Sequence, residues 1–170
     1  MRVPSVAALA FLLVAGPALA LTPAEVTETA KGVRPALEEI CSRTQAQVED
    51  PAFLRRMVSS YGFEPDGERF RYMGEDGELI VSGFGAGCTL TVTGEAAMVA
   101  EADRQLQAFA ASRGLTAEAS DQKVTGEEGR RITRERSAPG KGRLQWQVFD
   151  DFNGRDRPSR LEGVYSARTH

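Results

Sequence analysis

Two cysteines, Cys41 and Cys88, constrain the fold of this 170-residue chain more than any other feature. Cys41 borders the apolar stripe of an expected helix, and Cys88 begins the alternating segment 88–93, which is typical of a strand. A disulfide requires Cα atoms within about 7 Å of each other. A Cys41–Cys88 bond therefore fixes the first helical section over the start of that strand, and closing the loop stabilises the fold by about 4 kcal/mol.

The first twenty residues favour the oxidising compartment that such a bond needs. One positive charge, Arg2, precedes an unbroken apolar stretch at residues 6–14, which is too short to span a bilayer. Ala18 and Ala20 then form an A-x-A cleavage site. We expect a signal peptide over 1–20, a single α+β domain over 21–170 and a periplasmic or secreted protein; the alternative is an uncleaved membrane anchor. No transmembrane segment is expected after cleavage.

The charge of the chain is unevenly distributed. The whole chain has 21 Lys and Arg against 24 Asp and Glu, a net charge of −3, which argues against a nucleic-acid partner. Acidic residues dominate before residue 120, and basic residues dominate after it. This asymmetry has two interpretations: two solvated faces of one domain that attract each other, or a basic surface for an anionic partner such as phospholipid, polysaccharide or an acidic protein.

The first half of the chain predicts helices followed by strands. A capping box at 22–25 begins a helix that Pro35 interrupts near 32–34, and Asp50 caps a second helix that ends at Gly62. Alternating segments at 69–73 and 78–82 flank a turn at 75–77, and a third strand covers 88–93.

The second half repeats this order without a residue-level repeat. A long helix runs from 93 or 94 to about Arg113, with one apolar stripe. A polar loop at 118–128 precedes strands at 130–136, 144–148 and 161–168, and Gly163 is a candidate for a β-bulge in the last of them. The expected fold is therefore α+β, a two-layer antiparallel sheet of about six strands with helices on one face, in the order α-βββ-α-βββ.

No pattern in the sequence indicates a named chemistry. The glycine-rich segment 83–87 precedes a strand, whereas a dinucleotide fingerprint needs a helix there. The acidic segment 150–156 lacks the spacing of a calcium loop and is explained by a turn. The only histidine is His170, so a histidine-activated nucleophile is not indicated. We predict no cofactor, no metal site and no catalytic residues.

A binding role is the leading interpretation. Alternation along 130–136 places Arg130, Arg134 and Arg136 on one side of a strand, and Trp146 is either core or a stacking platform. We predict these four as binding residues of a small, non-catalytic accessory protein that contacts another envelope protein or an anionic surface. The alternative is a histidine-free hydrolase of envelope glycans, whose paired carboxylates would be assembled only in space.

Overall fold

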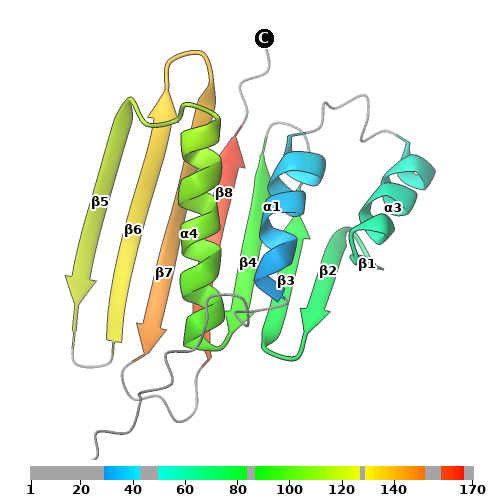
Figure 1. Ribbon diagram of the computed structural model, residues 1–170, viewed down its shortest axis with the longest axis horizontal. Coiled ribbons are helices and arrows are strands. Elements are labelled where there is room, and N and C mark those ends of the chain that lie inside the picture. Colours follow the sequence, from blue (N-terminus) through cyan, green and yellow to red (C-terminus); the bar gives the residue numbers. More distant parts are fainter. Residues whose placement is uncertain (1–28, 43–49, 84–86, 127–128, 152–157, 167–170) are drawn as a thin grey trace, which may run out of the picture.

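One antiparallel sheet of eight strands dominates the computed structural model, which describes residues 29–42, 50–83, 87–126, 129–151 and 158–166. The order across the sheet is β1-β2-β3-β4-β8-β7-β6-β5 (Figure 1). The strands are β1 (Glu64–Asp66), β2 (Arg69–Gly74), β3 (Gly77–Ser82), β4 (Cys88–Gly94), β5 (Glu118–Thr125), β6 (Gly129–Ala138), β7 (Gly142–Asp151) and β8 (Ser159–Ser166).

The sheet consists of two meanders that meet at their last strands. Strands β1 to β4 pair in sequence order, strands β5 to β8 do the same, and β4 pairs with β8 in the middle. Strands joined by short turns pair antiparallel because the chain has no length to cross over. The prediction of an antiparallel sheet with helices is confirmed, but the sheet has eight strands where about six were expected.

Both unexpected strands lie at the edges of the sheet. β5 occupies most of the segment predicted as a polar loop, and its side chains from 119 to 125 are all exposed. A strand exposed on both faces has no apolar alternation, so the periodicity that identifies half-buried strands is missing. β1 contains Pro65, whose missing N–H an edge strand tolerates because its outer side has no neighbouring strand to bond.

The helices are less uniform than the sheet. Three consecutive helical segments form the first section: η2 (Thr29–Gly32), α1 (Val33–Pro35) and η3 (Ala36–Cys41). They are followed by α3 (Pro51–Ser60) and α4 (Ala96–Ser112). The expected interruption by Pro35 takes the form of a change in helical type, from 3₁₀ through α to π, rather than a gap. None of the described helices is long and apolar enough to cross a bilayer.

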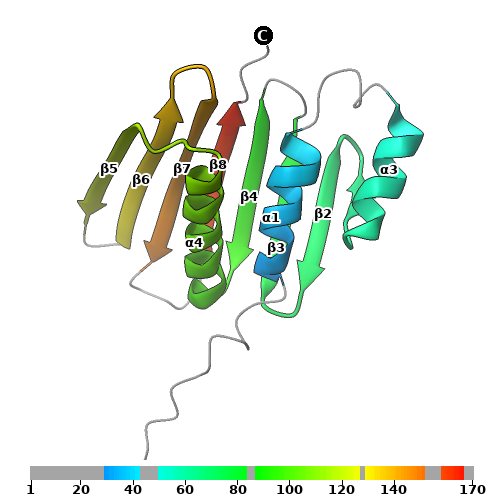
Figure 2. The ribbon, with the colours of Figure 1, turned by 45° about the horizontal axis from the view of Figure 1, so that its top comes forward.

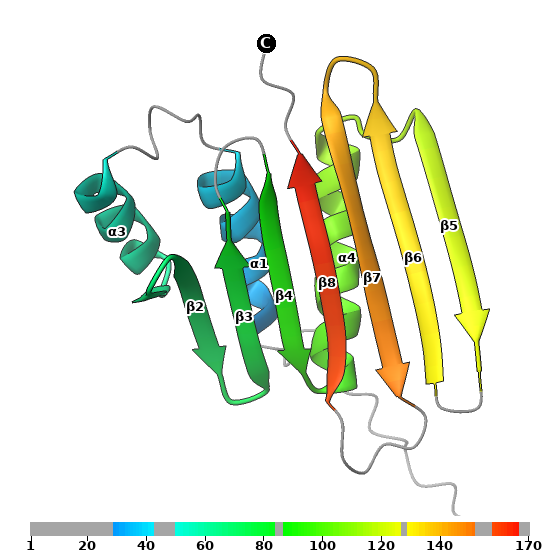
Figure 3. The ribbon, with the colours of Figure 1, turned by 180° about the vertical axis from the view of Figure 1, so that it is seen from behind.

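The first helical section and α4 lie side by side against the same face of the sheet (Figures 1 and 2). α4 contacts β4, β8 and β7, and the first section contacts β2 and β3, whereas α3 lies beside the β1 edge. Seen from behind, the opposite face of the sheet carries no described helix (Figure 3). β5 lies beyond α4, and none of the described helices covers it on either face, whereas β6 meets the margin of α4 through the Arg134–Asp103 ion pair.

The caps of α3 follow the sequence, whereas α4 begins at Ala96, two or three residues after the expected start, and its N-cap Glu95 makes no side-chain capping bond. The Asp50 carboxylate accepts hydrogen bonds from the backbone N–H groups of Ala52 and Phe53, both at 3.0 Å, and so caps α3 as predicted. Gly62 ends that helix with a φ of 84°, a conformation that residues with a Cβ rarely adopt. The capping box at 22–25 and the signal peptide lie outside the described residues.

The core fills the space between the helices and the sheet, and the disulfide lies inside it. Cys41 and Cys88 are bonded, with Cα atoms 5.2 Å apart and both residues fully buried. The predicted bond is therefore confirmed, together with the placement of the first helical section over the start of β4. The α4 stripe is buried as predicted, through Val99, Ala102, Leu106, Phe109 and Ala110.

Gly163 does not form a bulge. It pairs in continuous register with Leu90 on one side and Trp146 on the other. A Cβ on Gly163 would lie 3.3 Å from the Trp146 Cβ and 3.8 Å from a Leu106 methyl group. The absence of a side chain at Gly163 therefore makes room for the Trp146 side chain beneath α4.

Candidate binding groove and arginine network

A charged network joins α4 to strands β5 and β6 beside the core. Arg134 donates from Nε to the Asp103 carboxylate at 3.0 Å, and from Nη1 to Asp121 at 2.5 Å. Arg136 donates to the other oxygen of Asp121 at 2.6 Å. One aspartate comes from α4 and the other from β5, so the two arginines of β6 connect three elements.

Trp146 belongs to the same network. Its ring is buried, with 1% of its surface exposed, and its Nε1–H donates to Asp103 at 2.6 Å. The Arg136 guanidinium lies over the ring, 5.7 Å from its centroid, within cation–π range. Trp146 is thus a core residue with a satisfied polar atom, and a ring so buried offers no surface on which a ligand could stack.

The network changes the protonation equilibria of two members. The hydrogen bond from Arg136 lowers the pKa of Asp121 below its ordinary value of 3.8, and the charge of Arg134 adds to this effect against the opposing influence of burial. Burial lowers the pKa of Arg134, but the hydrogen bond and charge of Asp103, with help from Asp121, raise it overall. Both groups are therefore held in their charged forms.

The predicted binding residues come together on one side of the sheet, but there the arginines form ion pairs and Trp146 is buried. Register places Arg130 opposite Asp150, Arg134 opposite Trp146 and Arg136 opposite Leu144, all facing the helices. Arg130 donates to Asp150 at 2.7 Å, so each of these arginines has a carboxylate partner within the chain. An arginine already paired attracts an anionic partner less strongly than a free one, because its charge is largely compensated.

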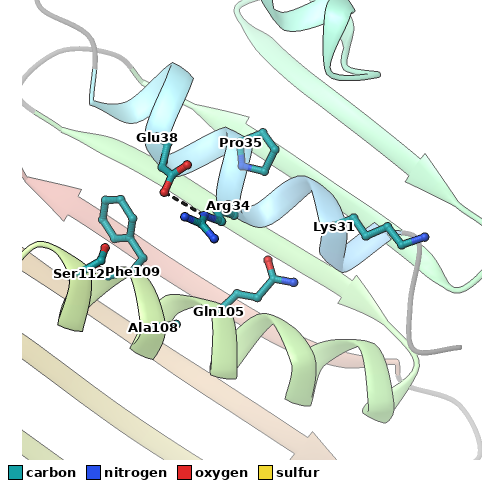
Figure 4. A pocket seen from close by; sticks show the side chains of 8 residues that line it. All are labelled: Lys31, Arg34, Pro35, Glu38, Gln105, Ala108, Phe109 and Ser112. Carbon is teal, nitrogen blue, oxygen red and sulfur yellow. Dashed lines mark hydrogen bonds and ion pairs between the residues drawn. The ribbon is translucent and has the colours of Figure 1, made fainter. Parts of the chain in front are cut away.

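A separate groove lies on the outer surface of the helical layer, between the first helical section and α4. It encloses about 530 Å³. Its walls are formed by Lys31, Arg34, Pro35 and Glu38 on one side and by Gln105, Ala108, Phe109 and Ser112 on the other (Figure 4). Each wall spans two turns of helix, which corresponds to a length of about 10 Å.

The groove combines an apolar floor with one unused polar atom. Phe109 and Gln105 reach from α4 toward the first helical section (Figure 4). The Gln105 Nε2 donates to Glu101 at 3.2 Å, so its Oε1 is the atom left for the groove, and this oxygen is buried without a hydrogen-bond donor among the described residues. An unsatisfied buried acceptor costs about 1–3 kcal/mol, which a bound donor would recover.

The rim of the groove carries positive charge. Arg34 pairs with Glu38 at 2.9 Å one helical turn away, with 71% of the arginine side chain exposed. No ion pair joins Lys31 to any described residue, and its side chain extends along the groove toward the start of the helix (Figure 4). The free charge at the groove, among the residues described, is therefore cationic.

Sequence reasoning did not find this groove. Phe109 was assigned to the apolar stripe of a helix, and nothing distinguished Gln105 or Lys31. The two walls come from helices about seventy residues apart in the chain, and only their packing creates the hollow between them.

The described residues contain no group of three or more His, Cys, Asp and Glu side chains that could hold a metal ion. The groove walls provide one carboxylate, Glu38, and it is paired with Arg34. A glycosidase needs two facing carboxyl groups, and the described walls of this groove do not supply them.

Comparisons of the chain with protein-family models, curated proteins and solved structures found no match.

Proposed function

We propose that the protein is a small, non-catalytic binding or accessory protein of the bacterial envelope, exported by its N-terminal signal sequence. The confirmed disulfide and the A-x-A site after an apolar stretch support export, because structural disulfides persist in oxidising compartments. The partner is another envelope protein, of which one short segment enters the groove between the first helical section and α4.

The unpaired Gln105 oxygen carries this proposal. Buried polar atoms in folded proteins nearly always have a partner, so an acceptor left open at the base of a groove indicates where a donor binds. A backbone N–H or a side-chain amide of the partner supplies that donor. An apolar side chain beside it packs on Phe109, and an acidic residue pairs with Lys31 at the rim.

The size of the groove limits what it accepts. A length of about 10 Å takes two turns of helix or about three extended residues. The recognised element is therefore a loop tip, a chain end or one or two anchoring side chains of a helix. Such a small contact is typical of a transient complex.

Blocking the groove tests the proposal. Ala108 is exposed on the groove wall, so Ala108→Arg fills the hollow without disturbing the core. Ala111→Arg adds the same side chain at an exposed position of the same helix outside the lining and serves as the matched control. A photo-crosslinking residue at each position, in protein expressed in its own cells, identifies what lies against the groove.

We expect a discrete protein adduct from position 108 and none from position 111. The captured partner, once purified, should bind wild type and Ala111→Arg equally and bind Ala108→Arg at least about tenfold more weakly, a difference of about 1.4 kcal/mol. A partner that binds Ala108→Arg as tightly as wild type would exclude the groove as its site. Adducts equal at the two positions would do the same.

A further inference from the structure

The β5 edge of the sheet is open. β5 pairs with β6 along one side, and no described segment lies along its other side (Figures 1 and 3). The side chains from 119 to 125 are exposed, and none of the described helices covers the strand. An edge of this length presents a row of unpaired N–H and C=O groups that can accept another strand.

We propose that this edge pairs antiparallel with the β5 strand of a second copy of the chain. The twofold axis lies between the two strands, level with Gln122, so that the two copies of Gln122 lie opposite each other. Two identical strands related by a twofold axis perpendicular to the sheet run antiparallel and present the same face on the same side. Residues directly opposite each other in an antiparallel pair point to the same face, and faces alternate along each strand. The two position numbers of a pair are therefore both even or both odd, so the axis is level with one residue and not with the gap between two.

Charge selects which residue lies on the axis. Asp121 and Lys123 flank Gln122 and point to the same face of the sheet. With the axis at Gln122, Asp121 of each copy lies opposite Lys123 of the other, which gives two pairs of opposite charge. With the axis at Asp121 or Lys123, that residue faces its own copy, and like charges across a strand pair are destabilising.

Strand length is consistent with the same register. With Gln122 on the axis, residues 119–125 all find a partner, which is nearly the whole of β5. A register centred on Asp121 pairs as many residues, 118–124, but it places Asp121 opposite its own copy, and registers centred nearer either end pair fewer residues. Strand length therefore leaves two registers, and charge selects the one at Gln122.

Both charged residues are able to make the new contact. Lys123 forms no ion pair with any described residue, so its charge is uncompensated within this part of the chain. Asp121 receives one hydrogen bond on each oxygen, from Arg134 and from Arg136, and 42% of its side chain remains exposed. A carboxylate has about four acceptor positions, so capacity for a lysine remains.

The helices do not obstruct the pairing. α4 lies over β4, β8 and β7 and contacts β6 at its margin, through the Arg134–Asp103 ion pair, so within the described chain no helix packs over β5. Four strands, β6 and β5 of each copy, would lie between the two copies of α4 in the dimer, a width of about 19 Å at the usual strand spacing. The result is one continuous sheet of two chains with the groove of each copy still open.

Sedimentation velocity of the disulfide-bonded protein over a wide range of concentration tests the association. Wild type should dimerise reversibly, and Lys123→Glu should weaken the dimer about tenfold or more, because both opposite-charge pairs become like-charge pairs. Lys141→Glu makes the same charge change at an exposed turn position away from β5 and should leave the dimer unchanged. A wild type that stays monomeric, or variants that weaken the dimer equally, would overturn the proposal.

Cross-linking tests the register without relying on Lys123. Gln122→Cys places two cysteines directly opposite each other, with Cα atoms about 5 Å apart, within disulfide reach. Ser120→Cys places them four residues out of register, about 14 Å apart along the strands. Efficient dimer formation by Gln122→Cys and not by Ser120→Cys is expected. Equal cross-linking of the two, or none by Gln122→Cys, would refute the Gln122 axis.

Discussion

Asp103 should be the most costly single charge to remove from this fold. Its carboxylate accepts the Trp146 Nε1–H at 2.6 Å and the Arg134 Nε–H at 3.0 Å, and only 14% of its side chain is exposed. In Asp103→Ala the buried indole N–H has no acceptor, and Arg134 retains only Asp121 as a partner. An unsatisfied buried donor and a broken, partly buried ion pair together cost about 3 kcal/mol.

Chemical unfolding at neutral pH measures this cost. A loss of about 3 kcal/mol also lowers the midpoint of thermal unfolding by about 6–12 °C in a domain of this size. Asp66→Ala is the matched control, because Asp66 pairs with Arg71 where both side chains are more than 40% exposed. Such surface pairs contribute about 0–1 kcal/mol, so this variant should unfold close to wild type.

A double-mutant cycle separates the indole hydrogen bond from the ion pair. Trp146→Phe removes the N–H, so Asp103→Ala should cost about 1–2 kcal/mol less in the Trp146→Phe background than in wild type. If Asp103→Ala lowers the free energy of unfolding no more than Asp66→Ala does, the network does not hold α4 on the sheet. If the two backgrounds give the same cost, the indole bond contributes nothing.

Four further outcomes are expected. Replacing Cys41 and Cys88 with alanine should destabilise the fold by about 4 kcal/mol, and intact mass under non-reducing conditions should show the wild-type bond as a loss of two protons. The pKa of Asp121 is lower in the fold than its ordinary value of 3.8. The contribution of ionised Asp121 to the free energy of unfolding is therefore complete above pH 3.8 and is lost as the pH falls through the lower folded value. The difference in stability between wild type and Asp121→Asn should accordingly shrink in urea titrations below pH 3.8. Gly77→Ala should destabilise by about 1–3 kcal/mol, since φ is 155° there and a Cβ would collide with the Thr93 carbonyl oxygen; a urea midpoint equal to wild type would contradict this. N-terminal sequencing of exported protein should begin at Leu21, and retention of Met1 in a membrane fraction would show the signal prediction to be wrong.

The arginine prediction shows how far strand alternation reaches. Alternation places Arg130, Arg134 and Arg136 on one side of β6, and the register has them there. What lies above that side depends on where α4 docks. Asp103 comes from the helix and Asp121 from the neighbouring strand, so the partners of Arg134 are set by packing across the sheet. Alanine at Arg134 should therefore reduce stability as well as any binding.

The two edge strands show where periodicity fails. β5 has exposed side chains on both faces, so burial imposes no alternation on its sequence, and only its backbone pairing with β6 makes it a strand. β1 has three residues, which is too short for any periodic pattern. Strands that bury one face, such as β4 with its alternating buried and half-exposed residues, were predicted correctly.

Local chemistry in the sequence determined the Asp50 cap and Gly62 end of α3, the half-buried strands, the turn at 75–77 and the cysteine pair, because capping, alternation and covalent reach act over short distances or demand one geometry. The tertiary structure alone decided which helix neighbours which strand. That docking buries Trp146 against Asp103, leaves the Gln105 oxygen open in a groove and leaves β5 without a second neighbour in the described chain. Each of these features joins residues far apart in the chain, and the free energy that aligns them comes from burying the whole core at once.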